Sequence, residues 1–209
     1  MAFPADLTST LTGASIYQLK RWRRTGLLVP EAQPFRPPLY SFRDLVAIRT
    51  VVWLRTEVSL QRIRKALANL PVLDFTEHPA AYEFATDGKS IGVLDENRQV
   101  VDLVERPGQI QIFNLAEVFS EFENKSGRRV VNFRKPRDHL EVHAGRLGGW
   151  PTVLHTRVPY DDVAKLLRTG DIRPEQVSRF YPSVTAEAAV DAYEFDREVR
   201  SMTRRARAA

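Results

Sequence analysis

Two serine residues stand directly before runs of apolar positions at helical spacing in the first third of the chain. Ser41 precedes such a run through about Thr56, and Ser59 precedes a second run that ends before Pro71. Serine at this place is typical of a helix N-cap, because its hydroxyl accepts a hydrogen bond from a free backbone N–H of the first turn. The pattern therefore predicts one helix in each run.

Two shorter helices are predicted ahead of these, one on each side of a glycine turn. The first covers residues 7–12 and stops at Gly13, and Ser15 is expected to cap the second. Side chains expected to face the core here are Ala14, Leu19 and Trp22. Helix, glycine turn and helix is the layout of a helix-turn-helix. Residues 29–38 contain four prolines, so they are predicted to form an extended wing.

Beyond Pro71 the pattern changes to short alternating segments, which are typical of strands. A hairpin signal, Asp87-Gly88, lies between the first two segments. The strands are expected at 81–85, 90–94, 99–104 and 109–113. Asn114 is predicted to cap a helix through about Glu123. Residues 72–125 are thus expected to be a small antiparallel β meander with one helix.

The last part of the chain is predicted to be mainly helical. Glycines within 145–149 are interpreted as a tight turn, since no Gly-Lys-Ser/Thr follows them as a phosphate-binding loop requires. Helices are expected to start at Pro159, at Pro174 and after the N-cap Thr185, with the last one running through about Met202. The expected fold class is α+β, with an N-terminal winged helix-turn-helix, the β meander with its helix, and a C-terminal three-helix, helix-turn-helix-like domain.

Charge divides the chain into the same three parts. Residues 1–71 hold 11 Lys and Arg against 4 Asp and Glu, residues 72–125 hold 4 against 11, and residues 126–209 hold 16 against 11. Three domains with these bounds are expected: a DNA-binding domain, an acidic β-rich domain and a helical domain with a basic tail. Phosphate attracts the first of them and repels the second.

Positive charge is most concentrated in the helix after Ser15, where residues 20–24 include one lysine and three arginines. A short amphipathic helix of this kind suits the major groove, which admits one helix, while its cations contact phosphates. A solvated basic helix is the alternative interpretation. The residues expected to contact DNA are the cations Lys20, Arg21, Arg24 and Arg36, together with Ser15, Tyr17 and Gln18.

Residues 6–71 resemble the DNA-binding domain of the MerR family. The likeness is carried by Gly13–Leu28, Leu39–Ser41, Asp44-Leu45, Ser59-Leu60 and Ile63. It implies a winged helix-turn-helix that binds duplex DNA as a dimer and commonly bends or twists it. Arg21 and Trp22 replace two common tyrosines, Arg23 replaces an acid, and Pro38 replaces a wing arginine, which implies different base contacts. The family's long C-terminal dimerisation helix is not evident after Pro71.

Residues 138–200 resemble a small helical domain common in bacterial toxin–antitoxin loci. The likeness is carried by Gly145–Pro151, Thr156–Pro159, Leu166-Leu167, Gly170-Asp171 and Tyr181–Thr185. The whole arrangement resembles VapB-type antitoxins, which implies a PIN-like ribonuclease toxin as partner, repression of the chain's own operon, and no enzymatic activity or cofactor. Acidic Glu187, Asp191 and Glu194 make the last helix a poor DNA contact, so the C-terminal helices are assigned to self-association or partner binding.

Two sets of C-terminal residues are expected to bind proteins. Candidate homodimer contacts are the apolar residues Val163, Leu167, Tyr193 and Phe195. Candidate toxin-binding residues are Arg197, Arg200, Arg204, Arg205 and Arg207. Arginine can pair bidentately with the clustered carboxylates of such a ribonuclease and displace its metal. The alternative is a frayed, solvated end that touches DNA phosphate.

Two further functions remain open at this point. One is a MerR-like transcriptional regulator that responds to a small molecule through the middle domain. The other is a metal-dependent nuclease that uses Asp95, Glu96, Asp102 and Glu105, although these are expected in turns and on exposed strand positions. His139 and His143 are not expected to form a metal site, because no third ligand is placed beside them.

The chain contains no cysteine, which excludes disulfides and thiolate metal sites. The first residues show no basic segment followed by an apolar one, and no stretch of about 18 apolar residues occurs. We therefore expect a cytoplasmic protein.

Overall fold

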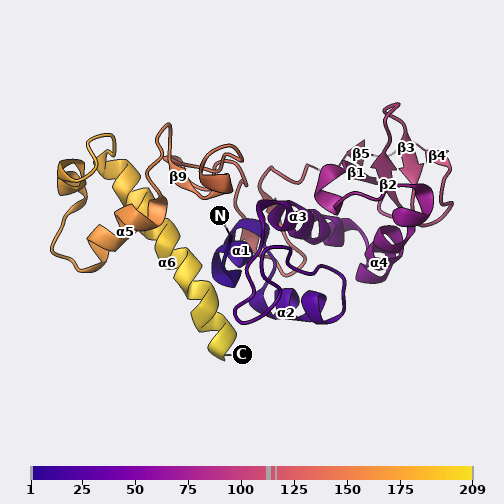
Figure 1. The fold of residues 1–209 in the computed structure, drawn as a ribbon, viewed down its shortest axis with the longest axis horizontal. Coiled ribbons are helices and arrows are strands. Elements are labelled where there is room, and N and C mark those ends of the chain that lie inside the picture. Colours follow the sequence, from indigo (N-terminus) through magenta and orange to yellow (C-terminus); the bar gives the residue numbers. More distant parts are fainter. Residues whose placement is uncertain (1, 112–113, 116, 209) are drawn as a thin grey trace.

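The computed structural model describes residues 2–111, 114–115 and 117–208. Four helices, α1 to α4, occupy the middle of an elongated molecule, with a small sheet at one end and helices α5 and α6 at the other (Figure 1). Helices and small antiparallel sheets coexist, so the α+β class is confirmed. Among the described residues, no helix combines the length and the apolar character that a membrane crossing requires.

The middle helices, which we call the head, are α1 (Ala5–Thr12), α2 (Ile16–Arg24), α3 (Phe42–Glu57) and α4 (Leu60–Asn69). The serine caps are confirmed: the hydroxyls of Ser15, Ser41 and Ser59 each accept a backbone N–H from three residues ahead. Gly13 ends α1 with a φ of 80°. A Cβ there would lie 2.5 Å from a Val130 methyl carbon, so both conformation and space require glycine.

The core of the head follows the apolar spacing. Ala14, Leu19 and Trp22 are buried as expected, with at most 2% of their surface exposed. Residues 29–38, which we call the proline loop, are not helical. A β-bridge between Gln33 and Leu39 closes this loop. The loop thus projects from the head beside α2.

A five-stranded antiparallel sheet follows the head, with strand order β4-β3-β2-β1-β5. Two short 3₁₀ helices, η1 (Pro71–Leu73) and η2 (Pro79–Ala81), lead into it. The strands are β1 (Phe84–Thr86), β2 (Ile91–Leu94), β3 (Val100–Asp102), β4 (Ile110–Gln111) and β5 (Asn114–Leu115). The expected hairpin at Asp87-Gly88 is confirmed, because Thr86 pairs with Ile91 across it. Observed strands are shorter than expected.

The predicted helix from Asn114 to Glu123 is wrong. Asn114 pairs with Thr86 as part of β5, and Phe122–Glu123 forms β6, which pairs with β7 (Arg129–Val130). Backbone carbonyls in this stretch accept hydrogen bonds from Arg49 of α3, and an α-helix would use the same carbonyls internally. The expected boundary between residues 125 and 126 falls within the β6–β7 turn, so this hairpin spans it.

The C-terminal lobe, residues 137–208, begins with a two-stranded pair, β8 (Leu140–Glu141) and β9 (Thr152–Val153). A tight turn between them is confirmed as η3 (Leu147–Gly149). Gly149 has a φ of 85°, and a Cβ there would overlap the Phe42 ring of the head. Close approach to α3 therefore requires this glycine.

Helices α5 (Tyr160–Arg168) and α6 (Ala186–Ala208) pack together in the lobe, joined by η4 (Pro174–Arg179). The helix expected at Pro174 is thus a 3₁₀ helix, and α6 continues six residues past Met202. The homodimer interface expected from the sequence is wrong for three of its four members. Val163, Leu167 and Phe195 are buried within the chain itself, at most 8% exposed, and so cannot face a second copy.

Candidate nucleic-acid interface

Helix α2 separates its side chains into two faces. Leu19 and Trp22 point into the core, whereas Tyr17, Lys20 and Arg21 are exposed on the other face, followed by Arg24. Tyr17 keeps 68% of its surface exposed, which is unusual for a large aromatic residue. In the described part of the chain no carboxylate pairs with Lys20, Arg21 or Arg24. The face therefore offers both unpaired cations and an aromatic ring to a partner.

Contacts between α2 and the proline loop fix the second wall of this site. The Arg23 guanidinium donates to the Pro34 carbonyl at 3.0 Å and lies 5.7 Å from the centre of the Phe35 ring. Phe35 itself remains 68% exposed. A hollow of about 610 Å³ lies between helix and loop, and its lining residues are Tyr17, Lys20, Arg21, Arg23, Arg24, Val29 and Phe35.

Arg23, Val29 and Phe35 were not among the residues expected to contact DNA. Arg23 is a positioning residue, because its guanidinium ties α2 to the proline loop. Phe35 stands next to Arg36 among the prolines, and an aromatic ring beside a cation on an extended loop is the signal that identifies it. Arg36 is exposed within the loop that the Gln33–Leu39 bridge closes.

Ser15 and Gln18 start α2 with a capping box. The Ser15 hydroxyl accepts from the Gln18 N–H at 3.1 Å, and the Gln18 side-chain oxygen accepts from the Ser15 N–H at 2.7 Å. Both side-chain oxygens therefore serve the start of the helix. This geometry fixes the direction in which Tyr17 leaves the first turn.

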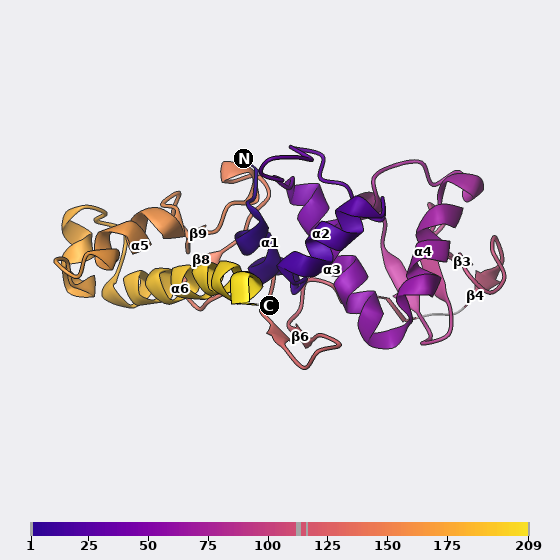
Figure 2. The same ribbon diagram turned by 90° about the horizontal axis from the view of Figure 1, so that it is seen from below.

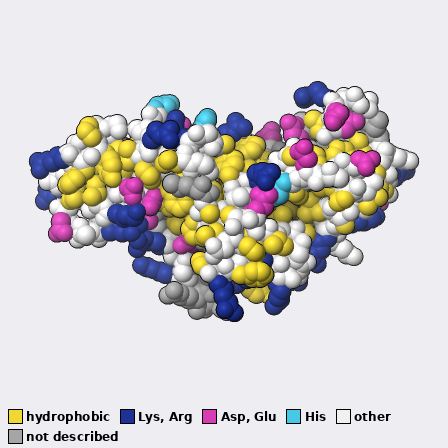
Figure 3. Space-filling view, in the orientation of Figure 1, with side chains coloured by type: hydrophobic (Ala, Val, Ile, Leu, Met, Phe, Trp, Pro, Cys, Tyr) yellow, Lys and Arg dark blue, Asp and Glu magenta, His cyan; other side chains and the backbone are white. Residues whose placement is uncertain are grey.

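Other helices of the head add positive charge to the α2 face. Burial, and next the positive charge of Arg21 on α2, lower the pKa of Arg55 on α3. Arg64 of α4 donates to the Thr25 hydroxyl at the end of α2, with 3.5 Å between the two atoms. Figure 3 shows Lys and Arg side chains on both sides of an apolar patch at the lower centre, where Figure 1 places α2.

The expected toxin-binding arginines lie on the last turns of α6. Arg197, Arg200 and Arg204 are exposed, and Arg200 pairs with Asp196 at 2.9 Å. Arg205 and Arg207 lie within the helix, but their side chains are outside the described part of the chain. The described turns here are helical, so Arg197, Arg200 and Arg204 project from a regular scaffold.

Among the described residues, the acidic residues that a nuclease would need form no cluster with the spacing of metal ligands. Asp102 is buried, and its carboxylate accepts from the Ser90 hydroxyl at 2.6 Å and from the Val104 and Arg106 N–H groups. It therefore organises the turn after β3 and was wrongly placed on an exposed position. Of the two histidines considered as metal ligands, His139 instead contacts Asp191, with 2.8 Å between its Nδ1 and the carboxylate oxygen Oδ2.

One group in the described ranges has metal-ligand chemistry: Glu31, Asp44 and His78. The Ala80 N–H donates to His78 Nδ1 at 3.2 Å, so the neutral ring carries its proton on Nε2. This Nε2 faces Asp44 Oδ1 at 3.6 Å as a donor, which disfavours metal ligation. Asp44 Oδ2 accepts the N–H groups of Ser41 and Glu31. The group therefore ties the proline loop to the start of α3.

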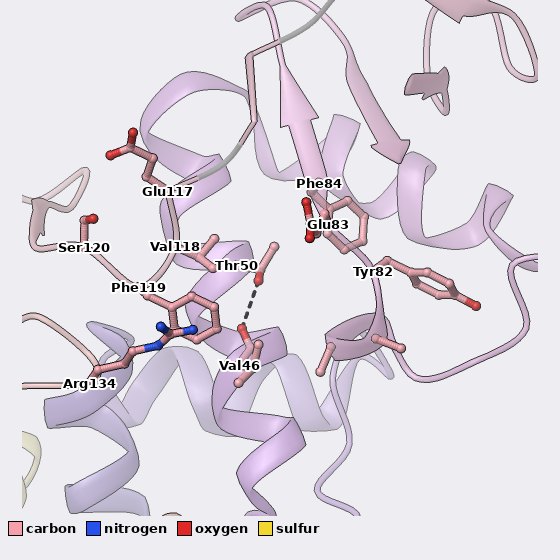
Figure 4. A pocket seen from close by; sticks show the side chains of 12 residues that line it. Val46, Thr50, Tyr82, Glu83, Phe84, Glu117, Val118, Phe119, Ser120 and Arg134 are labelled. Atoms are coloured by element: carbon pink, nitrogen blue, oxygen red, sulfur yellow. Dashed lines mark hydrogen bonds between the residues drawn. The ribbon is translucent and has the colours of Figure 1, made fainter. Parts of the chain in front are cut away.

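A pocket of about 570 Å³ lies between α3 and the segments around β1 and β6. Val46 and Thr50 form its floor, and the Arg134 guanidinium lies 4.7 Å from the centre of the Phe119 ring at one side (Figure 4). Exposed carboxylates of Glu83 and Glu117 stand at the rim. The pocket is open and has mixed polarity.

Comparisons with known proteins give a partial match and a shared fold. Residues 140–195 match the model of a family described as "Protein of unknown function (DUF433)". No curated protein matches the sequence. Among solved structures, the chain is similar to the X-ray crystal structure of Rv2018 from Mycobacterium tuberculosis, with a TM-score of 0.50, 15% identity, and coverage of 91% of this chain and 95% of that chain. At this identity the likeness concerns the fold alone.

Proposed function

We propose that this chain is a transcriptional regulator that binds duplex DNA through α2 and the proline loop. The observation that carries the proposal is the exposed face of α2, where Tyr17, Lys20, Arg21 and Arg24 stand together with no carboxylate paired to them in the described residues. In this proposal α1 and α2 form a helix-turn-helix, and the proline loop is its wing.

Physical chemistry supports the major groove as the place of α2. The groove admits one helix, and cations along such a helix bind the phosphates on either side. Tyr17 lies at the first turn, the part of a recognition helix that contacts base edges. Phe35 and Arg36 on the proline loop are then placed to contact the adjacent backbone or minor groove.

The direct test is binding to the DNA upstream of the chain's own gene. We expect fluorescence anisotropy to show tight binding to this duplex, competition by unlabelled duplex of the same sequence, and weaker competition by a shuffled duplex. Equal competition by both duplexes, or no binding at low salt, would contradict the proposal.

We further propose that the regulator is the antitoxin of a toxin–antitoxin pair and neutralises a PIN-like ribonuclease. The resemblance of residues 138–200 to the helical domain of such loci supports this role, and the exposed arginines of α6 supply groups that can pair with active-site carboxylates. The neighbouring gene separates the candidates: a short toxin gene favours the antitoxin, whereas an efflux or detoxification gene favours a regulator that senses a small molecule in the pocket beside Phe119.

Truncation after Met202 tests the arginine contact. We expect the shortened chain to lose inhibition of the purified ribonuclease and rescue of cells that express it, because Arg204, Arg205 and Arg207 are removed. A full-length variant with these three arginines replaced by alanine keeps the helix and should behave in the same way. Full inhibition by both variants would show that the toxin binds elsewhere.

A dimer is expected on DNA. A single head of this size offers few base contacts, and two-fold sites double them. Light scattering of the protein with its operator should give two chains per duplex at micromolar concentration. A single chain per duplex would show that the head acts alone.

A further inference from the structure

The end of α6 presents cations close to α2, although the two helices lie at opposite ends of the sequence. Arg197, Arg200 and Arg204 follow at three- and four-residue spacing and are all exposed, so they share one side of the helix. Phe195 and Val199 on other sides are buried. This end of α6 is therefore amphipathic, with a basic outer side.

Contacts with α1 hold this basic end against the head. The Thr203 hydroxyl donates to Asp6 at 3.3 Å, and the Arg128 guanidinium bridges the Ser9 carbonyl at 2.8 Å and the Met202 sulfur at 3.3 Å. Helix α6 also contacts α2 directly. Figures 1 and 2 show its last turns beside α1 and α2 on the underside of the molecule.

The charge balance along this end of α6 favours an anionic partner. A groove of about 710 Å³ runs beside it, and its charged lining consists of Arg137, Arg168, Arg197, Arg200, Arg204, Glu194, Asp196 and Glu198. Asp196 is neutralised by Arg168 and Arg200, at 2.6 and 2.9 Å, and Glu198 is neutralised by Arg137 at 2.7 Å. Among the described residues no ion pair holds Arg197, Arg204 or Glu194, so the lining keeps a net positive charge. The acidic residues that made this helix an expected poor DNA contact lie nearer its start than Arg197 and Arg204.

We propose that the basic end of α6 continues the DNA-binding surface of α2. When α2 lies in the groove of a duplex, the neighbouring part of the same duplex lies beside the last turns of α6. Arg197 and Arg204 then bind phosphates of this flanking backbone. The inference rests on the proposed function, because it concerns the same DNA. Figure 3 shows Lys and Arg side chains along the lower part of α6 and again beneath α2, which supports one extended contact.

Phosphate backbone is the chemistry that fits these residues. Regularly spaced arginines on an exposed helix side neutralise phosphates without reading bases, and such contacts fix the register of a protein on its duplex. A ribonuclease active site is the other anionic partner. The common location of α2 and the end of α6 on one side of the molecule favours DNA for Arg197 and Arg204, and the truncation after Met202 decides whether Arg204 also contacts the toxin.

The test compares two double variants that each remove two exposed cations. R197Q/R204Q changes the end of α6, and the matched control K89Q/R106Q changes the turns of the sheet, far from α2. The probe is the duplex upstream of the chain's own gene, together with shorter duplexes cut back from each end. Affinity is measured by fluorescence anisotropy as a function of salt concentration.

The affinity of the unsubstituted chain should fall as salt rises. We expect this fall, as the slope of log affinity against log salt, to be shallower by about 2 in R197Q/R204Q, because each lost phosphate contact contributes about 0.9. Across a rise from about 50 to about 200 mM salt, the variant should therefore lose about 10-fold less affinity than the unsubstituted chain. The affinity of the variant should also stay the same when flanking base pairs are removed, whereas the affinity of the unsubstituted chain should fall. The control K89Q/R106Q should keep the salt slope and the dependence on duplex length of the unsubstituted chain.

An unchanged slope together with an unchanged dependence on duplex length would overturn the inference and leave the proposed function intact. Loss of ribonuclease inhibition by the same variant would then assign these arginines to the toxin. Absence of duplex binding by the unsubstituted chain would overturn the proposed function and the inference together. Circular dichroism confirms that each variant is folded.

Discussion

Replacing Arg21 and Arg24 together by alanine is expected to weaken operator binding by about 100-fold. Each guanidinium is exposed on α2 with no carboxylate paired to it in the described residues. A hydrogen bond to a charged group contributes about 1.5 kcal/mol or more, and about 1.4 kcal/mol corresponds to a factor of ten in affinity. The salt dependence of binding should also become shallower by about 2, since two phosphate contacts are lost.

Anisotropy titrations at several salt concentrations measure both quantities. The matched control is K89A/R106A, which removes two exposed cations from the sheet and should leave affinity and salt slope nearly unchanged. Binding that survives R21A/R24A but is lost when residues 185–200 are altered would assign the DNA contact to the C-terminal helices. That outcome would contradict the proposed function.

Local signals explain why the helices of the head were predictable. Ser15, Ser41 and Ser59 satisfy free N–H groups at helix starts, and Gly13 adopts the left-handed conformation that ends α1. These interactions span only three or four residues, so the sequence alone identifies them. The cations of α2 were identified for the same reason, because the amphipathic spacing of Leu19 and Trp22 leaves them on the outer face.

Long-range contacts explain the errors. The segment after Asn114 has apolar residues at helical spacing, but its backbone pairs with β1 and supplies carbonyls to Arg49, which is about 70 positions away in the sequence. Similarly, Val163 and Phe195 are apolar whether they face the core of their own lobe or a second copy, and spacing does not distinguish the two. Phe35 was not predicted as part of the site, because only the folded loop brings its ring to Arg23 of α2.

Arg49 is the clearest case of a residue whose role the sequence conceals. It lies on α3 and is fully buried, although its position among Ile48, Val51 and Val52 gives no sign of a special environment. Its guanidinium donates to four backbone carbonyls, those of Leu11, Val118, Ser120 and Val131. The centres of the Phe122 and Phe133 rings lie 5.1 and 5.5 Å from the Cζ atom of this guanidinium. One side chain thus joins α1, α3 and both sides of the β6–β7 hairpin.

Replacing Arg49 by methionine is expected to destabilise the fold by about 3–5 kcal/mol, because four backbone carbonyls, one buried and three partly buried, lose their donor at once. Burial lowers the pKa of Arg49 to about 9, so the guanidinium is still charged at neutral pH and its hydrogen bonds are charge-assisted. Urea unfolding followed by circular dichroism measures the free energy of unfolding. R49K keeps a charged donor at this position and should therefore lose less stability than R49M. It should still be less stable than the unsubstituted chain, since an ammonium reaches fewer of the carbonyls than a guanidinium does.

The matched control for this substitution is Arg43→Met on the same helix. Arg43 is exposed, and its ion pair with Glu31 at 2.9 Å lies at the surface, so we expect a loss of about 1 kcal/mol or less. If R49M were as stable as R43M, the buried hydrogen bonds would contribute little, and another contact would have to hold the β6–β7 hairpin on α3. If R49M is destabilised as expected, the hairpin and the end of α1 should lose protection from hydrogen exchange before α4 does, because Arg49 ties both of them to α3.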